Sequence, residues 1–159
     1  MSVLVAALAS CTFGGDDDFD YGEKLLKEGE FAPDFALFTD ENPDGMMLSG
    51  LRGSYVLLEF WRSTCGDCRD ATPAMKRIYD TYARADLSLW ACLSMPTRPS
   101  GVRISRRTPQ WMQHREQSAA SESAVAAAYH IDWTPTFYLV DPQGRISFAT
   151  VTSARWKKG

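Results

Sequence analysis

One stretch decides the fold of this chain: Phe60-Trp61-Arg62-Ser63-Thr64-Cys65-Gly66-Asp67-Cys68-Arg69. An apolar run at 55–58 lies shortly before it, and apolar residues recur after it at helical intervals, at Ala71, Met75, Ile78, Tyr79 and Tyr82. This order predicts a buried strand, a tight turn and a helix, with Cys65 at the helix N-terminus. Unpaired backbone N–H groups favour a thiolate there, and Cys68, one turn on, can reach back to close a small disulfide. Two cysteines in this setting indicate a redox pair.

Further motifs along the chain make the pattern specific. They are Phe31-Ala32-Pro33-Asp34-Phe35, the Arg52-Gly53 turn, Pro73, and Trp133-Thr134-Pro135-Thr136-Phe137-Tyr138-Leu139-Val140-Asp141 with Gly144 after it. With them, the chain from about Phe31 to Ile146 resembles the thioredoxin-fold thiol–disulfide oxidoreductases of the extracytoplasmic TlpA/ResA-like branch, related to AhpC/TSA proteins. The resemblance implies an α/β fold, a thioredoxin-like three-layer α/β/α sandwich with a mixed sheet and an N-terminal β-hairpin extension.

The remaining elements are predicted from apolar patterns and turn residues. We expect a short helix at 21–30 that carries Leu25 and Leu26 toward the domain, a hairpin from 35–38 and 46–48, and a buried strand at 87–94. A helix at 109–130 begins with core-facing Trp111 and Met112, and strands 136–140 and 145–150 form an antiparallel pair. Residues 152–159 are too short and basic for the helix that usually ends the family's fold. We therefore expect that helix to be lacking, with its sheet face covered by the N-terminal segment or a partner, or left open in a less stable version.

Length and charge exclude several classes of protein. The 159 residues fit one domain, and a net charge of −3 without a basic, aromatic-interleaved run argues against nucleic-acid binding. No apolar run is long enough to span a bilayer. One local basic group is interpreted as a solvated loop or as a docking surface for an acidic partner; it comprises Arg98, Arg103, Arg106 and Arg107.

The N-terminus resembles a bacterial lipoprotein signal. A short apolar run ends in Leu8-Ala9-Ser10-Cys11, although no Lys or Arg precedes it. We expect residues 1–10 to be a signal peptide, 11–30 a lipidated Cys11 with its polar tether, and 31–159 the thioredoxin-like domain. The protein would then be anchored on the periplasmic side of a bacterial membrane. The alternative is that the apolar run forms an N-terminal strand or helix of the folded domain.

The resemblance assigns roles to the residues of the pair. Cys65 is the expected nucleophile, Cys68 resolves the mixed disulfide, and Gly66 lets a substrate backbone come close. Asp67 occupies a position where proline or histidine is common, and its carboxylate disfavours a thiolate, which Arg62 and Arg69 partly offset. We therefore expect a relatively reducing pair. Inert thiols or a buried structural disulfide are the alternative.

Four further residues complete the expected site. Glu59, six residues before Cys65, would accept the proton of Cys68 if burial raises its pKa; alternatively it is an edge or solvent-facing glutamate. Trp61 would pack beneath the disulfide or serve as an ordinary core residue. Pro135 is expected to follow a cis peptide bond, leaving the Thr134 backbone to pair with an extended substrate strand; the alternative is a trans proline at a strand start.

Metal binding is not favoured. Cys65, Cys68, His114 and His130 could supply four zinc ligands, but their spacing fits no finger pattern. Both histidines are interpreted as surface or helix-end residues, and Cys92 as a buried apolar residue rather than a third redox cysteine. We expect no metal and no cofactor.

The sequence thus predicts an enzyme that reduces or isomerises protein disulfides in the cell envelope through its Cys-Gly-Asp-Cys pair and is re-reduced by a membrane electron donor. Two alternatives stay open. One is a peroxiredoxin-like peroxidase, since Phe31-Ala32-Pro33-Asp34-Phe35 also occurs in that relative. The other is a thioredoxin-fold binding module without redox turnover.

Overall fold

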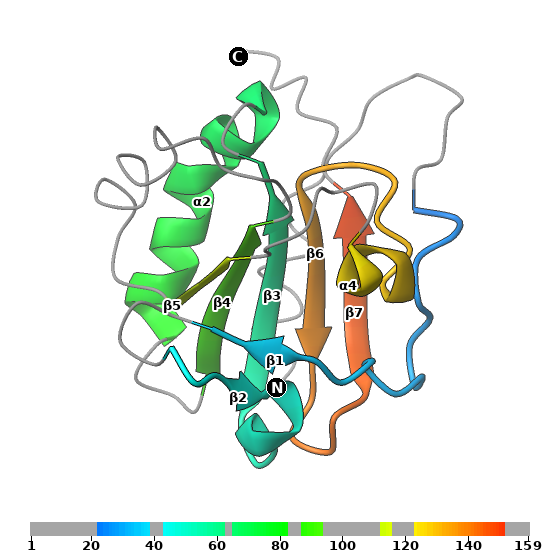
Figure 1. Ribbon diagram of the computed structural model, residues 1–159. Helices are drawn as coiled ribbons and strands as arrows, with labels where there is room; N and C mark the ends of the chain where they lie inside the picture. The colour runs from blue at the N-terminus through cyan, green and yellow to red at the C-terminus, as the bar shows by residue number, and fades with distance from the viewer. Residues whose placement is uncertain are drawn as a thin grey trace.

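The central sheet is mixed, as expected. The computed structural model describes residues 22–38, 43–62, 65–82, 87–93, 112–115 and 123–151, with 87–93 and 112–115 as backbone only. Five strands form the sheet in the order β5-β4-β3-β6-β7 (Figure 1): β3 (Tyr55–Trp61), β4 (Leu87–Leu93), β5 (Met112–Arg115), β6 (Thr136–Val140) and β7 (Ile146–Val151). Strands β3, β4 and β5 are parallel, whereas β6 runs antiparallel to β3 and to β7. β3 therefore lies at the centre.

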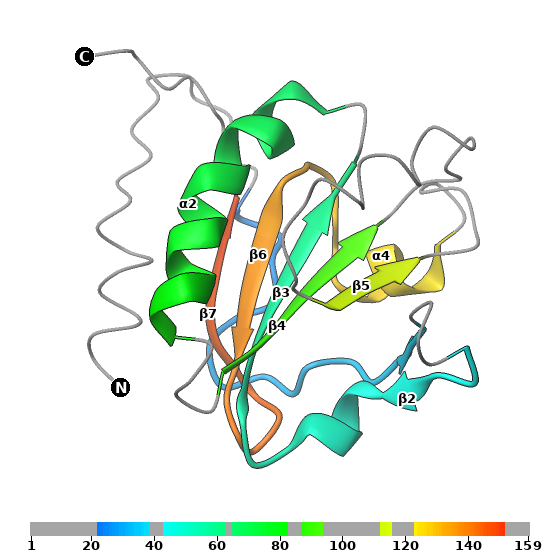
Figure 2. The same cartoon turned by 90° about the vertical axis from the view of Figure 1, so that its left-hand side faces the viewer.

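Helix α2 (Gly66–Tyr82) covers one face of the sheet (Figure 2). Its buried residues recur at three- and four-residue intervals and form one apolar stripe: Cys68, Ala71, Met75 and Ile78. They pack with Leu57 and Trp61 of β3. Because side chains alternate along a strand, Glu59 between these two points to the same side. The central strand therefore presents an acid to the layer beneath the helix.

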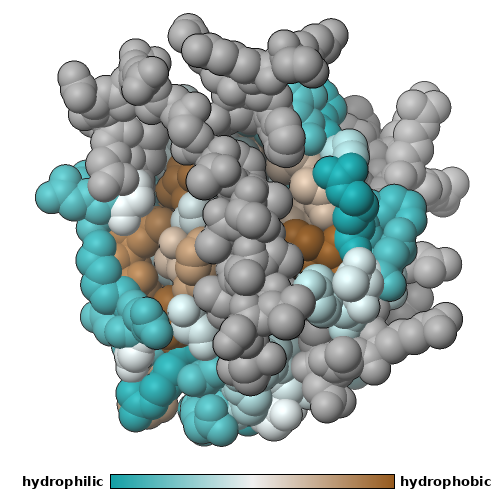
Figure 3. All heavy atoms as spheres, turned by 180° about the vertical axis from the view of Figure 1, so that it is seen from behind, coloured by the Kyte–Doolittle hydropathy of each residue, from teal (hydrophilic) through white to brown (hydrophobic). Residues whose placement is uncertain are grey.

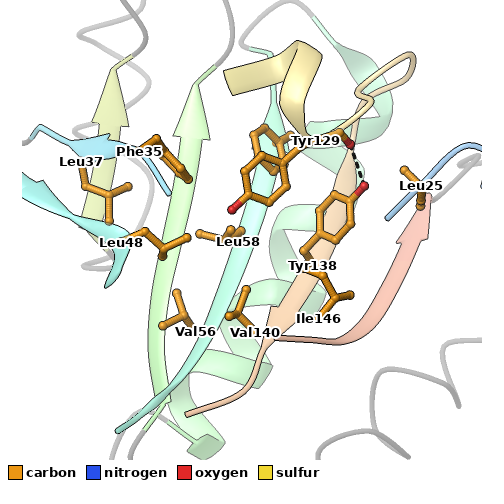
Figure 4. Close-up of a cluster of buried hydrophobic side chains, with 11 residues drawn as sticks. Leu25, Phe35, Leu37, Leu48, Val56, Leu58, Tyr129, Tyr138, Val140 and Ile146 are labelled. Carbon is orange, nitrogen blue, oxygen red and sulfur yellow. Dashed lines mark hydrogen bonds between the residues drawn. The ribbon is translucent and has the colours of Figure 1, made fainter. Parts of the chain in front are cut away.

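The opposite face carries the second part of the core. It is covered by the hairpin β1 (Ala36–Leu37) and β2 (Met46–Met47), the short 3-10 helix η1 (Leu48–Leu51) and helix α4 (Ala124–Ala128). Figure 4 shows the aromatic and aliphatic side chains gathered there, with the hydroxyl of Tyr138 donating to the carbonyl of Tyr129 at 2.7 Å. The expected hairpin and the expected three layers are confirmed.

The helix expected at 21–30 is wrong. Residues 22–30 form turns, with Gly29 at φ +88°. Their backbone instead pairs with the start of β7, where Gly29 N–H donates to Ile146 and Ile146 N–H donates to Glu30. These bonds pair backbone N–H and C=O groups at the exposed edge of β7. A helix at 21–30 would use its own backbone groups internally and could not form them. Leu25 is nevertheless buried, as its apolar character suggested.

The long helix expected at 109–130 is also wrong. Met112 lies in β5, which extends the sheet in parallel register beside β4, rather than at a helix start. The alanine-rich part does form a helix, the short α4, which the Ser123 hydroxyl caps by accepting from Ala126 N–H at 3.0 Å. Sheet pairing has therefore overridden the helical pattern of the first half. Trp111 lies outside the described residues.

Several predictions fall on parts of the chain outside this description, namely those for Cys11, the arginines of 98–107 and residues 152–159. Figure 3 looks onto the α2 side of the molecule and shows apolar surface between hydrophilic margins. Partly buried residues packed against the core on this side include Tyr55, Tyr79, Tyr82 and Phe148.

Among the described residues, no helix has the length and apolar character needed to cross a membrane.

Candidate active site

Cys65 caps the N-terminus of α2. Its carbonyl accepts from Arg69 N–H at 3.4 Å, and its sulfur accepts from Cys68 N–H at 3.3 Å. The sulfur thus occupies the place of a capping oxygen, where the unpaired backbone donors of the first turn favour a negative charge. The side chain is partly exposed, and Gly66 beside it is exposed. An incoming sulfur can therefore approach Cys65 from solvent.

Cys68, by contrast, is enclosed. It is 1% exposed and packs in the core between α2 and the sheet. Burial raises the pKa of the Cys68 thiol to about 12, and the hydrogen bond and charge of Cys65 add to this effect. Hydrogen bonds from the Arg62 backbone and the Thr134 side chain act in the opposite direction. Both cysteines are free thiols here. The two sulfurs therefore differ in accessibility and in proton affinity.

The loop before β6 closes the site from the other side. The pairing of Phe60 with Thr136 places the residues before β6 next to the end of β3. The Thr134–Pro135 peptide bond is cis, as predicted. The Cys65 thiol donates a hydrogen bond to the Thr134 carbonyl at 3.4 Å. Thr134 therefore contacts both cysteines, Cys65 through its backbone and Cys68 through its side chain.

Glu59 is a buried acid in the central strand. It is 5% exposed, and burial raises its pKa from 4.5 to about 8. The interpretation as an edge or solvent-facing glutamate is wrong, because β3 is hydrogen-bonded on both sides. At neutral pH this carboxyl is largely protonated and can exchange a proton with its surroundings. Burial therefore raises the pKa of Glu59 as expected, and its role as a proton acceptor stays a prediction.

Other predicted residues lie around the pair. Trp61 is 7% exposed in the same cluster as Cys68, and its indole N–H has no hydrogen-bond partner among the described residues. Asp67 is half-buried in the first turn of α2. The Arg69 guanidinium lies 3.9 Å from where a Cβ on Gly66 would stand, so this cation approaches the same turn.

The structure describes the side chains of only three of the four residues that were considered as zinc ligands and not favoured, namely Cys65, Cys68 and His130. His130 lies two residues after the end of α4, with its Nδ1 2.7 Å from the Lys24 carbonyl oxygen. The side chains of His114 in β5 and Cys92 in β4 lie outside the description. Within the described residues, no three of the His, Cys, Asp and Glu side chains form a possible metal group.

Two features of the site were missed from sequence. One is the hydrogen bond of the Thr134 side chain to Cys68, because only the backbone of Thr134 was expected to act. The other is Trp133, which is 37% exposed beside the site although large apolar side chains are usually buried. The position of Trp133 two residues before Pro135 was the available signal.

Comparison with known proteins agrees with this geometry. Residues 29–149 match the family described as AhpC/TSA. The chain belongs to the AhpC/TSA family. Thiol-disulfide oxidoreductase ResA of Bacillus subtilis is 25% identical over 125 residues, which cover 79% of this chain and 68% of ResA. Thioredoxin-like protein YneN of the same organism is 27% identical over 121 residues, 76% of this chain and 69% of YneN.

The solved structures confirm the fold. A thiol-disulfide oxidoreductase from Bacteroides fragilis superposes with a TM-score of 0.68 at 25% identity, covering 77% of this chain and 90% of that structure. The predicted family and fold are therefore confirmed, and this AhpC/TSA member is a TlpA/ResA-like thiol–disulfide oxidoreductase.

Proposed function

We propose that the protein reduces or isomerises disulfides of other proteins through Cys65 and Cys68. The observation that carries the proposal is the asymmetry of the pair: Cys65 is partly exposed at a helix N-terminus, whereas Cys68 is buried with a pKa of about 12. The exposed sulfur suits attack on a substrate, and the enclosed one suits intramolecular resolution.

The reaction would proceed in two exchanges. The Cys65 thiolate attacks one sulfur of the substrate disulfide, forming a mixed disulfide and releasing the first substrate thiolate. Cys68 then loses its proton and attacks the Cys65 sulfur, which releases the second substrate thiolate and leaves a Cys65–Cys68 disulfide. Two electrons pass to the substrate, and a membrane dithiol donor would restore the pair.

Glu59 would serve the second exchange. Because the Cys68 thiol holds its proton tightly at neutral pH, the resolving step needs a base. Glu59 lies on the same side of β3 as Leu57 and Trp61, which pack with Cys68. With a pKa of about 8, the ionised fraction of its carboxyl, a minority at pH 7 that grows toward pH 8, would accept the Cys68 proton. Gly66 and the Thr134 backbone would receive the substrate chain, with Trp61 and Asp67 bordering the pair.

The cell envelope is the proposed place of action. The sequence at Leu8–Cys11 supports it, since a lipidated Cys11 would hold the domain at the periplasmic side of a membrane. Metabolic labelling with a radioactive fatty acid tests this, with Cys11→Ser as the control. Label that persists in this variant, or no label in the unaltered chain, would remove the anchor from the proposal.

The equilibrium reduction potential tests the catalytic proposal. The pair should titrate reversibly in a dithiothreitol buffer as a two-electron couple below about −200 mV, followed by tryptophan fluorescence. A midpoint near −120 mV would indicate an oxidant instead. Absence of a reversible transition would favour a binding module, and peroxide consumption dependent on Cys65 would favour a peroxidase.

A further inference from the structure

The loop that faces the cysteines presents an aromatic side chain to solvent. Trp133 is 37% exposed, whereas the next residue, Thr134, is 8% exposed and hydrogen-bonds Cys68 through its side chain. Thr134 precedes a proline, which restricts it to extended backbone. The two residues lie in a bend just before β6, and the Thr134 carbonyl accepts a hydrogen bond from the Cys65 thiol. Thr134 is therefore buried against the sulfurs, whereas the neighbouring Trp133 is exposed at the rim.

The backbone of Trp133 is held in place. Its carbonyl accepts a hydrogen bond from the Thr136 hydroxyl at 2.7 Å, and Thr136 is fully buried as the first residue of β6. This bond ties the backbone of Trp133 to the start of β6. An aromatic ring on a fixed backbone loses little conformational freedom when it binds.

Exposed large apolar side chains elsewhere in the described chain lie far from the cysteines. They are Phe31 and Met47. Phe31 pairs with Arg145 beside the start of β7, and Met47 belongs to β2, just before η1 and the start of β3. Both positions are at the end of the sheet opposite to Cys65, which follows the end of β3 (Figure 1). Trp133 is thus the exposed indole that a chain bound at the described site would meet.

We propose that Trp133 determines substrate specificity by binding an aromatic or bulky apolar side chain next to the reactive cysteine of the substrate. A substrate segment that pairs with the Thr134 backbone runs past the indole, and its residues beside the cysteine come within reach of it. A contact between two aromatic rings stabilises binding by more than the apolar area it buries would give. The inference rests on the proposed function, since it concerns the substrate of the same dithiol pair.

The experiment compares two peptides that differ only beside their cysteine. Each is joined to glutathione by a disulfide, one with phenylalanine on both sides of its cysteine and the other with serine. Reduced protein releases peptide and glutathione while its own pair becomes oxidised, and the second-order rate constant is followed by chromatography. We expect the unaltered protein to prefer the phenylalanine peptide by about three- to tenfold.

Variants assign the preference to the indole. Trp133→Ala should lower the preference to about one, and Trp133→Phe should keep part of it because a ring remains. Phe31→Ala is the matched control, an exposed aromatic at the far end of the sheet, and should keep the full preference. Circular dichroism and the reduction potential verify folding. If Trp133→Ala does not fold, Trp133→Phe against the unaltered protein supplies the comparison.

The outcomes separate the two proposals. Equal rates for both peptides with the unaltered protein, or a preference that survives in Trp133→Ala, would overturn the role of Trp133 while leaving disulfide reduction intact. A protein that releases neither peptide would instead overturn the proposed function. A preference lost in Trp133→Ala and kept in Phe31→Ala would support the inference.

Discussion

Replacing the buried acid should make the protein more stable, and increasingly so as the pH rises. In Glu59→Gln the carboxyl becomes an amide of nearly the same shape that does not ionise. Glu59 has its pKa raised from 4.5 to about 8 by burial. Below pH 4.5 the group is protonated in both the folded and the unfolded chain, so it has no pH-dependent effect there. Between the two values only the unfolded chain releases the proton, and this favours unfolding.

The magnitude follows from the two pKa values. Each pH unit in this window lowers the free energy of unfolding by about 1.4 kcal/mol. From pH 4.5 to 7.5 the loss amounts to roughly 4 kcal/mol, and it levels off as the folded protein ionises above pH 8. Since small domains are stable by only about 5–15 kcal/mol, this effect is large enough to dominate the pH profile.

Urea unfolding at a series of pH values from 4.5 to 8.5 measures the effect. We expect the difference between Glu59→Gln and the unaltered protein to grow in favour of the variant by about 1.4 kcal/mol per pH unit up to pH 7.5. Glu28→Gln, which alters an exposed glutamate, is the control and should follow the unaltered protein. Parallel profiles for Glu59→Gln and the unaltered protein would show that Glu59 ionises normally in the fold and would refute the reasoning.

Three further predictions concern the sulfurs and the core. Cys68→Ser should accumulate a mixed disulfide between Cys65 and a protein substrate, seen as a gel shift reversed by dithiothreitol, whereas Cys65→Ser should accumulate none. Iodoacetamide at pH 7.5 should modify Cys65 at least about tenfold faster than Cys68, whose pKa is about 12; equal labelling by tandem mass spectrometry would contradict the burial of Cys68. Tyr138→Phe removes a hydroxyl that donates to Tyr129 and accepts from Leu26 N–H, and should cost about 1–3 kcal/mol in urea unfolding. A loss below about 0.5 kcal/mol would mean that these groups find other partners.

The central part of the fold could be predicted because its local signals agree with its tertiary contacts. The apolar run before Cys65, the helical spacing after it and the turn at Gly144 each specify one element, and the structure has β3, α2 and the β6–β7 hairpin there. The predictions at 21–30 and 109–130 were wrong for one reason. In both, backbone groups pair with a strand distant in sequence, β7 in one case and β4 in the other. Local apolar spacing carries no information about such pairing.

The candidate site shows the same division. The positions of Cys65, Cys68 and Pro135 follow from motif and resemblance, and the cis bond and the asymmetry of burial agree with them. The hydrogen bond of the Thr134 side chain to Cys68 could not be predicted, because it depends on the direction in which one side chain leaves the loop. The exposure of Trp133 likewise depends on how the bend before β6 is oriented toward the sulfurs.

The loss of folding stability caused by burying Glu59 is itself an argument that this residue takes part in the reaction. A leucine at this position would pack among its apolar neighbours without the loss of roughly 4 kcal/mol at pH 7.5 that burial of the acid entails. A surface glutamate would carry no such cost. Removal of this acid should stabilise the fold, and the acid lies on the side of β3 that faces a thiol which must lose its proton, so its position favours the proposed chemical role over a packing role. If Glu59→Gln proves more stable and also slows resolution of the mixed disulfide, stability and catalysis oppose each other at this one side chain.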